Sequence, residues 1–229
     1  MRIYYDSEKT KELNEKIIKK FGKERQKRTS DFPIHVSDLI GCEMKFYCRM
    51  MGLEESHTHK SIGMMVFGII GQGIVQQLFP KNECEYETKL ENFVFGHIDV
   101  YEKKKFPLEI KATRKRVYKK RNIPERWIKQ LMAYMSMEHK RKGWLIFLNV
   151  FTSQVSAFCI EMTDDELLAY NMFLLGKAYK FKNAIENKSC DELEVSPDQY
   201  EYCEYKHTCP RREECYLKWR DKKWSKSKR

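Results

Sequence analysis

The distribution of apolar positions predicts a chain in which strands and helices are interspersed. Four segments have the alternation or the continuous apolar character of strands: 93–95, 106–112, 143–151 and 153–161. Four others are predicted to be helices, the last opened by the capping box Thr163-Asp-Asp-Glu166: 7–28, 64–79, 124–137 and 164 to about 187. Strands interrupted and followed by helices indicate an α/β protein with a mixed central sheet.

Two local features sharpen this prediction. The glycine-rich segment 64–79 contains Gly68, Gly71 and Gly73, which favours a helix that packs closely against its neighbours. Ser37 is a candidate N-cap for a helix that begins near it.

The two predicted strands on either side of a lysine-rich turn form a candidate metal site. If the hairpin is centred on Lys104, Asp99 lies opposite Glu109, because each is five residues from the centre. Side chains alternate along a strand, so Glu109 and Lys111 share one face while Ile110 points to the other. Two carboxylates and one ammonium group then converge on a single patch of sheet.

Carboxylate and carbonyl oxygens are the ligands that Mg²⁺ and Mn²⁺ prefer. Asp99, Glu109 and the main-chain carbonyl of Ile110 are therefore candidate metal ligands. Lys111 could orient a water molecule or offset negative charge that develops during phosphodiester hydrolysis. The alternative is an exposed hairpin whose Glu and Lys side chains are only solvated.

Neighbouring residues support the catalytic interpretation. Gln130 and Tyr134 are four apart on a predicted helix and share a face, from which they could hydrogen-bond a phosphate or the attacking water. Gly96 removes a side chain where another part of the chain or a ligand could approach closely. The alternative for the Gln/Tyr pair is an ordinary amphipathic helix.

A basic segment follows the hairpin and would lie at the rim of the site. Its members are candidates for neutralising phosphates, with one tyrosine that could stack on a base: Arg114, Lys115, Arg116, Tyr118, Lys119, Lys120 and Arg121. The alternative is a solvated basic surface.

Composition favours a globular protein with a polyanionic partner. The chain has 229 residues, of which 41% are hydrophobic, and 44 Lys and Arg against 33 Asp and Glu give a net charge of +11. No run approaches the ~20 apolar residues of a membrane span, and the N-terminus lacks the apolar core of a signal peptide. We therefore expect a cytoplasmic protein, in which the eight cysteines are thiols or metal ligands. The oligomeric state is not predicted.

Three cysteines close together near the C-terminus indicate a second metal site. They are Cys203, Cys209 and Cys215, and the pair Cys209-Pro210 is of the kind found in ferredoxins. Zinc would need a fourth ligand, for which Cys42 or His207 is available. The other cysteines are predicted to be buried core residues or incidental: Cys48, Cys84, Cys159 and Cys190.

The motifs Gly96-x-x-Asp99-Val, Glu109-x-Lys111 and Gln130-x₃-Tyr134 resemble those of the RecB-type branch of the PD-(D/E)xK nucleases, and in size the chain resembles the CRISPR-associated RecB-like exonucleases. This resemblance implies that Asp99 and Glu109 bind metal, that Lys111 is catalytic, and that Gln130 and Tyr134 form an accessory motif. It also implies an iron–sulfur cluster, [4Fe–4S] rather than [2Fe–2S], whose ligands are one N-terminal and three C-terminal cysteines: Cys42, Cys203, Cys209 and Cys215.

The chain departs from this family at two places. Many relatives carry a metal-binding histidine on the helix that precedes the hairpin, but no histidine lies between Lys60 and Glu91, and Gln72, Val75 or Gln76 takes its place. Many relatives also have two residues, rather than five, between the first two cysteines of the C-terminal group.

The resemblance implies one domain with a restriction-endonuclease-like core over about 61–187. About 30–60 and 188–219 would form an iron–sulfur lobe, and 220–229 a basic tail. The implied function is a Mg²⁺- or Mn²⁺-dependent exonuclease on single-stranded DNA that trims fragments for CRISPR spacer acquisition, with integrase proteins as partners. The alternatives are a viral or repair nuclease of the same branch, and a non-catalytic DNA-binding subunit in which a zinc ion or an iron–sulfur cluster links the two ends of the chain.

Overall fold

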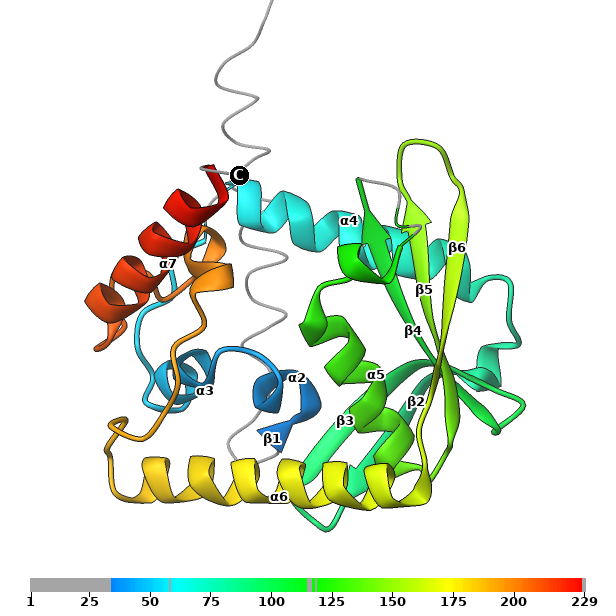
Figure 1. Cartoon of the computed structure of the whole chain (residues 1–229), viewed down its shortest axis with the longest axis horizontal. Helices are drawn as coiled ribbons and strands as arrows, with labels where there is room; N and C mark the ends of the chain where they lie inside the picture. The colour runs from blue at the N-terminus through cyan, green and yellow to red at the C-terminus, as the bar shows by residue number, and fades with distance from the viewer. Residues whose placement is uncertain (1–33, 58, 115–116, 118, 228–229) are drawn as a thin grey trace, which may run out of the picture.

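The computed structural model describes residues 34–57, 59–114, 117 and 119–227 (Figure 1), so the predicted helix over 7–28 lies outside the described residues. Within these ranges a mixed sheet has six strands: β1 (Ile34–His35), β2 (Cys84–Leu90), β3 (Val94–Glu102), β4 (Phe106–Thr113), β5 (Lys142–Asn149) and β6 (Val155–Glu161). The α/β class and the mixed sheet are as predicted.

Strand β3 organises the sheet because it pairs with three others. Val94 pairs with Leu90 of β2 and with Ile34 of β1, so β1 and β2 lie on opposite edges of β3. Strand β4 pairs with the far end of β3, at Val100, on the same edge as β1. The ladders with β1 and β4 therefore leave residues 96–99 of β3 unpaired along this edge, in the described part of the chain.

Helices cover both faces of the sheet (Figure 1). The described helices are α2 (Val36–Leu39), α3 (Glu43–Met50), α4 (His59–Gln76), α5 (Glu125–Met137), α6 (Asp164–Glu186) and α7 (Arg212–Ser227), with 3-10 turns η1 (Lys81–Glu83), η2 (Lys120–Asn122) and η3 (Pro197–Tyr202). Leu145 and Phe147 of β5 pack in one apolar cluster with residues of α5, whereas Ile146 and Leu148 pack in another with Val75 of α4. Since side chains alternate along β5, α4 and α5 lie on opposite faces.

The terminal parts of the described chain pack on each other as a lobe beside the sheet. The N–H of Ser56 donates to the carbonyl of Glu204 at 2.7 Å, and the hydroxyl of Thr208 donates to the carbonyl of Glu54 at 2.9 Å. Helix α6 runs from the sheet to this lobe (Figure 1), where Phe181 stacks on Phe46 of α3. The N-terminal and C-terminal segments thus share one core with α6.

Several local predictions need correction. Ser37 does not cap a helix: α2 begins one residue earlier and is capped by His35, whose ring nitrogen accepts the Ser37 N–H at 3.2 Å. Helix α4 is not packed closely on all sides, because it lies on the sheet along one stripe. Only Gly71 among its glycines meets a neighbour, Ala112, and five large apolar residues are exposed: Met64, Phe67, Ile69, Ile70 and Ile74.

Strands β1 and β2 were not predicted. The sequence of β2 alternates charged residues with partly buried ones and contains little that is strongly apolar. Among the helices of the described ranges, none has the combination of length and apolar character that crossing a membrane requires.

Candidate active site

The predicted hairpin forms with the predicted register. Val100 pairs with Leu108 and Glu102 with Phe106, so the hairpin is centred on Lys104. The ladder stops at Asp99, whose Oδ2 accepts the Ile110 N–H at 2.6 Å in place of a main-chain carbonyl. This hydrogen bond holds the Asp99 carboxylate beside β4, opposite Glu109.

Glu109 is a buried carboxylate with one oxygen engaged and one not. Its side chain is 1% exposed, and the ammonium group of Lys111 pairs with Oε1. Oε2 is buried and has no hydrogen-bond partner among the described residues. An unsatisfied buried carboxylate oxygen is costly in a folded protein, and a bound cation would remove that cost.

Both carboxylates have a raised tendency to hold a proton. Burial raises the pKa of Asp99, and the neighbouring Glu109 raises it further, outweighing Lys111 and the Ile110 N–H. Burial likewise raises the pKa of Glu109, although Lys111 opposes this. Removal of two adjacent carboxylates from water, with one ammonium group between them, leaves negative charge that a divalent cation would balance.

Gln130 and Tyr134 support this site from α5. The amide oxygen of Gln130 accepts from the Lys111 ammonium at 3.0 Å, and its amide nitrogen donates to the Tyr134 hydroxyl at 3.1 Å. Tyr134 is fully buried and therefore cannot reach a phosphate in solvent. Gly96 makes this packing possible, because a Cβ at that position would lie 2.7 Å from the Tyr134 ring. The group that approaches Gly96 closely is therefore the Tyr134 side chain of α5.

Glu85 is a third carboxylate at the site, which the sequence analysis missed. The pairs Cys84–Val100 and Tyr86–Ile98 place Glu85 opposite Asp99 on the other edge of β3. Gln72 and Gln76 of α4 each donate to its Oε1, at 2.6 and 2.7 Å. Because β2 has weak strand character in the sequence, only the charge at position 85 could have drawn attention to it.

Of the three residues expected in place of the relatives' helix histidine, two have side chains that reach the candidate site. Val75 is 2% exposed and packs under the sheet, so it cannot bind a ligand there. Gln72 and Gln76 both point toward the site, and Gln76 also donates to the main-chain carbonyl of Asp99 at 2.9 Å.

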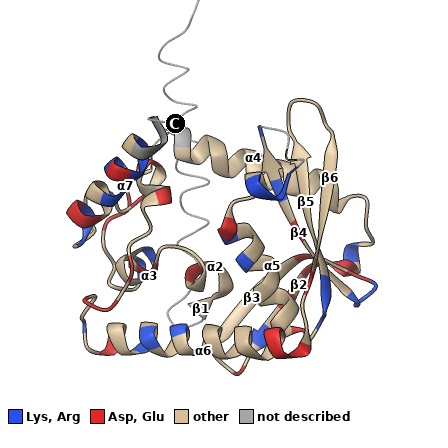
Figure 2. Cartoon of the chain, viewed as in Figure 1, with Lys and Arg blue, Asp and Glu red and all other residues tan. Residues whose placement is uncertain are grey.

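The basic segment is partly described. Arg114, Lys119, Lys120 and Arg121 are exposed, and the Arg114 guanidinium lies 5.9 Å from the Phe67 ring centre on α4. Figure 2 shows the basic turn η2 beside α4 and the ends of β4 and β5. Lys115, Arg116 and Tyr118 lie outside the described residues.

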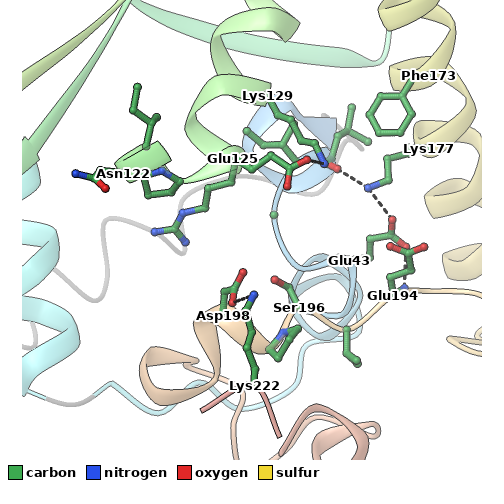
Figure 3. Close-up of a pocket in the computed structure, with 18 of the residues that line it drawn as sticks. Glu43, Asn122, Glu125, Lys129, Phe173, Lys177, Glu194, Ser196, Asp198 and Lys222 are labelled. Carbon is green, nitrogen blue, oxygen red and sulfur yellow. Dashed lines mark hydrogen bonds and ion pairs between the residues drawn. The ribbon is translucent and has the colours of Figure 1, made fainter. Parts of the chain in front are cut away.

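A cavity of about 580 Å³ lies between the beginning of α5, α6 and the lobe (Figure 3). Five cationic side chains line it: Arg121, Arg126, Lys129, Lys177 and Lys222. Lys129 pairs with Glu125 and Lys222 with Asp198, so these charges are balanced within the wall. Arg126 is one helical turn from Gln130, which places the cavity next to the candidate active site along α5.

The four predicted cluster cysteines come together in the lobe. A small pocket is lined by Cys42, Cys203, Cys209 and Cys215, and by a fifth, Cys48, which is buried in the core as predicted. A hydrogen bond from Cys48 lowers the pKa of Cys209 to about 7. Cys42 Sγ accepts the Ser196 N–H at 3.3 Å.

The other candidate ligands lie elsewhere. His207 does not line the cysteine pocket, and neither do Cys84, Cys159 and Cys190. In the ranges that the structure describes, no group of three or more His, Cys, Asp or Glu side chains is arranged so that it could hold a metal ion. The cysteines therefore converge on one pocket without forming a completed metal site.

Comparisons with known proteins identify the fold. No family model matches the sequence, and a search of curated proteins finds no match. The structure is similar to the crystal structure of SSO0001, with a TM-score of 0.59 and 18% identity over 87% of this chain and 96% of that one. It is also similar to an alkaline exonuclease (LHK-Exo) from Laribacter hongkongensis, with a TM-score of 0.50 and 14% identity over 68% of this chain and 90% of that one. The chain therefore shares its fold with these two structures.

Proposed function

We propose that the protein is a metal-dependent DNA nuclease whose site is built on Asp99 and Glu109. The observation that carries this proposal is the buried, unpartnered Oε2 of Glu109 beside the Asp99 carboxylate, with Lys111 on the same face. The shared fold with an exonuclease is consistent with it. The net charge of +11 favours a nucleic-acid substrate.

The donor set fits Mg²⁺ or Mn²⁺, since it consists of carboxylate oxygens. Asp99 and Glu109, with the Ile110 carbonyl, would hold the ion, which when bound polarises the phosphodiester and acidifies water. The Lys111 ammonium offsets negative charge at the phosphate that develops during attack. Gln130 fixes that ammonium through its amide oxygen, and Tyr134 fixes Gln130, so this pair positions Lys111 rather than touching the substrate.

The nucleic-acid strand is proposed to be single-stranded DNA that follows the basic segment and the cavity at the start of α5. The exposed residues Arg114, Lys119, Lys120 and Arg121 would contact phosphates, together with Lys115, Arg116 and Tyr118. The 580 Å³ cavity is within the usual range of ligand sites, roughly 300–1,000 Å³. An exonuclease that trims DNA for CRISPR spacer acquisition, in contact with integrase proteins, is the specific role that the sequence resemblance favours.

The cysteine pocket is proposed to hold an iron–sulfur cluster, [4Fe–4S] rather than [2Fe–2S]. Thiolates are the ligands of such clusters, and Cys42, Cys203, Cys209 and Cys215 line one buried pocket. A cluster here would link the N-terminal and C-terminal segments of the lobe and so stabilise the fold.

The decisive test is DNA cleavage by paired variants. Asp99→Asn and Glu109→Gln should each reduce Mn²⁺-dependent degradation of labelled single-stranded DNA by at least about 10²–10³-fold, the effect expected when a group that stabilises transition-state charge is lost. Glu87→Gln, on the exposed surface of β2, is the matched control. Wild-type rates in both site variants would exclude this site.

The cluster is tested by spectroscopy of anaerobically purified protein. We expect the wild-type protein to absorb near 400 nm, as an iron–sulfur cluster held by thiolates would. Cys209→Ser should abolish this absorption. Cys159→Ser should retain it, because Cys159 is exposed on β6, away from the pocket. Iron in equal amount in both variants would contradict the cysteine assignment.

The second candidate function is a non-catalytic DNA-binding subunit. No histidine follows Lys60 in α4, and the amides of Gln72 and Gln76 reach the candidate site instead, which favours this alternative. Tight DNA binding by wild-type protein without metal-dependent cleavage would establish it.

A further inference from the structure

We propose that Glu85 is a third carboxylate beside the cation site, whose negative charge strengthens cation binding without coordinating the ion, and that Gln72 and Gln76 hold its side chain there. The inference rests on the proposed function, because it assigns a further residue to the same site. Neither Glu85 nor its contacts were apparent from the sequence.

The sheet register places three carboxylates in one row. Glu85 lies between Cys84 and Tyr86, which pair with Val100 and Ile98 on either side of Asp99, and Glu109 follows Leu108, which pairs with Val100. The row therefore crosses the centre of the candidate site.

The two glutamines fix Glu85 in a defined way. Both amide nitrogens reach Oε1, which leaves Oε2 available. The amide nitrogen of Gln76 has two hydrogens, and it donates both to Glu85 and to the Asp99 carbonyl. Gln76 thereby ties Glu85 to the same residue that provides a predicted metal ligand.

The electrostatics of the site show that Glu85 acts on its neighbours. It is among the groups that raise the pKa of Asp99, of Glu109 and of Tyr134. Three carboxylates balanced by one ammonium group, Lys111, leave a net negative site. The buried Oε2 of Glu109, which has no partner among the described residues, is an independent indication that a cation completes it.

The backbone at Glu85 is also unusual. Its φ is +52°, in the left-handed region that residues other than glycine seldom enter. The β2–β3 ladder is interrupted at this residue, between Cys84 and Tyr86, and the Glu85 carboxylate accepts from Gln72 of α4.

The inference is tested by Mn²⁺ binding to DNA-free protein, measured by the loss of the free Mn²⁺ signal in electron paramagnetic resonance. Glu85→Gln removes the charge but keeps an oxygen that the glutamines can reach. We expect its Mn²⁺ affinity to fall about 10–100-fold, the usual effect of losing a group that supports a metal site. Glu87→Gln, two residues along β2 and exposed, should bind Mn²⁺ as the wild type does.

Each outcome has a distinct meaning. Unchanged Mn²⁺ affinity in Glu85→Gln, with wild-type protein binding normally, would overturn the role of Glu85 and leave it as an anchor for α4. Wild-type protein that binds no Mn²⁺ would overturn the cation site itself, and Glu85 with it. If Glu85→Gln weakens Mn²⁺ binding but the wild type does not cleave DNA, the inference stands while the nuclease proposal fails.

Discussion

Glu43 and Glu109 are both 1% exposed, yet the protein surrounds the two carboxylates in opposite ways. Glu43, at the start of α3, has Lys177 2.8 Å from one oxygen and, at the other, Lys180 at 3.1 Å and the Glu194 N–H at 2.8 Å. Among the described residues, Glu109 has one cation on one oxygen and no hydrogen-bond partner on the other. Oε1 of Glu43, like Oε2 of Glu109, has no hydrogen-bond partner in the described part of the chain, but it has an ion pair with Lys177, so each oxygen of Glu43 faces a cation and only one oxygen of Glu109 does.

The pKa values of Glu43 and Glu109 are shifted in opposite directions. Burial alone would raise the pKa of Glu43, but Lys177, the Glu194 N–H and Lys180 together lower it below its ordinary value. Burial raises the pKa of Glu109, and Lys111 does not compensate. A buried acid with a lowered pKa stabilises the folded state in its charged form. A buried acid with a raised pKa destabilises the folded state when it is charged, and a functional role would explain why such a residue is present.

The largest expected effect is on Glu43. Glu43→Ala leaves two lysines without their shared carboxylate and removes the link between α3, α6 and Glu194, so we expect a loss of about 3–5 kcal/mol in the free energy of unfolding. Denaturant unfolding measures it. Glu186→Ala, which removes an exposed partner of Lys182 on α6, should change stability by less than about 1 kcal/mol. A loss of that size in Glu43→Ala would mean that its buried pairs contribute little.

The next effect concerns the single cation of Glu109. Lys111→Ala leaves Glu109 buried without a charge partner among the described residues, and we expect a loss of about 2–3 kcal/mol at pH 7 that Mn²⁺ partly restores. Lys180→Ala should cost less than about 1 kcal/mol, because Lys177 and the Glu194 N–H still hold Glu43. Equal losses in both variants would remove the distinction between the two sites.

The sequence predicts the parts of the site that depend on local geometry. Asp99, Glu109 and Lys111 follow from the hairpin register, and Gln130 and Tyr134 from helical spacing. Glu85 escapes prediction because β2 is weakly patterned and its position depends on pairing with β3.

Contacts between distant segments are equally invisible in the sequence. Glu43 meets Lys177 and Lys180 only after α6 has crossed from the sheet to the lobe (Figure 1). Cys48 was predicted to lie in the core because a single cysteine is usually a buried apolar residue. Its place beside Cys209 arises because α3 packs on the C-terminal segment.

The pH dependence of stability separates the two carboxylates further. Because the folded-state pKa of Glu43 is below its ordinary value of 4.5, its contribution is present above about pH 4.5 and is lost as the pH falls through the folded-state value. The stability difference between wild type and Glu43→Gln should therefore be constant from pH 7 to about 5.5 and shrink below about pH 4.5, by about 1 kcal/mol or more. Unfolding by urea at each pH measures it. If the stability difference between wild type and Glu43→Gln instead grows as the pH falls, the folded-state pKa of Glu43 is raised rather than lowered.

The smallest expected effect is the most informative about Glu109. Its folded-state pKa is raised, so the folded protein holds more protons than the unfolded chain above the ordinary value of 4.5, and stability falls as the pH rises toward the folded-state pKa. At pH 7 in the absence of divalent cations, Glu109→Gln removes a buried charge and should leave stability unchanged or raise it by about 1 kcal/mol, which is about 2–4 °C in melting temperature for a chain of this size.

Glu43→Gln is the matched control for this substitution, with the same chemistry and burial, and it should lower the melting temperature. Saturating Mn²⁺ should then raise the melting temperature of the wild type by stabilising the folded state, by about 2.7 kcal/mol at a hundredfold excess over Kd, and should not do so in Glu109→Gln. If Glu109→Gln instead destabilises the cation-free protein as much as Glu43→Gln does, Glu109 supports the fold in the same way as Glu43. Its unpartnered oxygen would then no longer indicate a cation site.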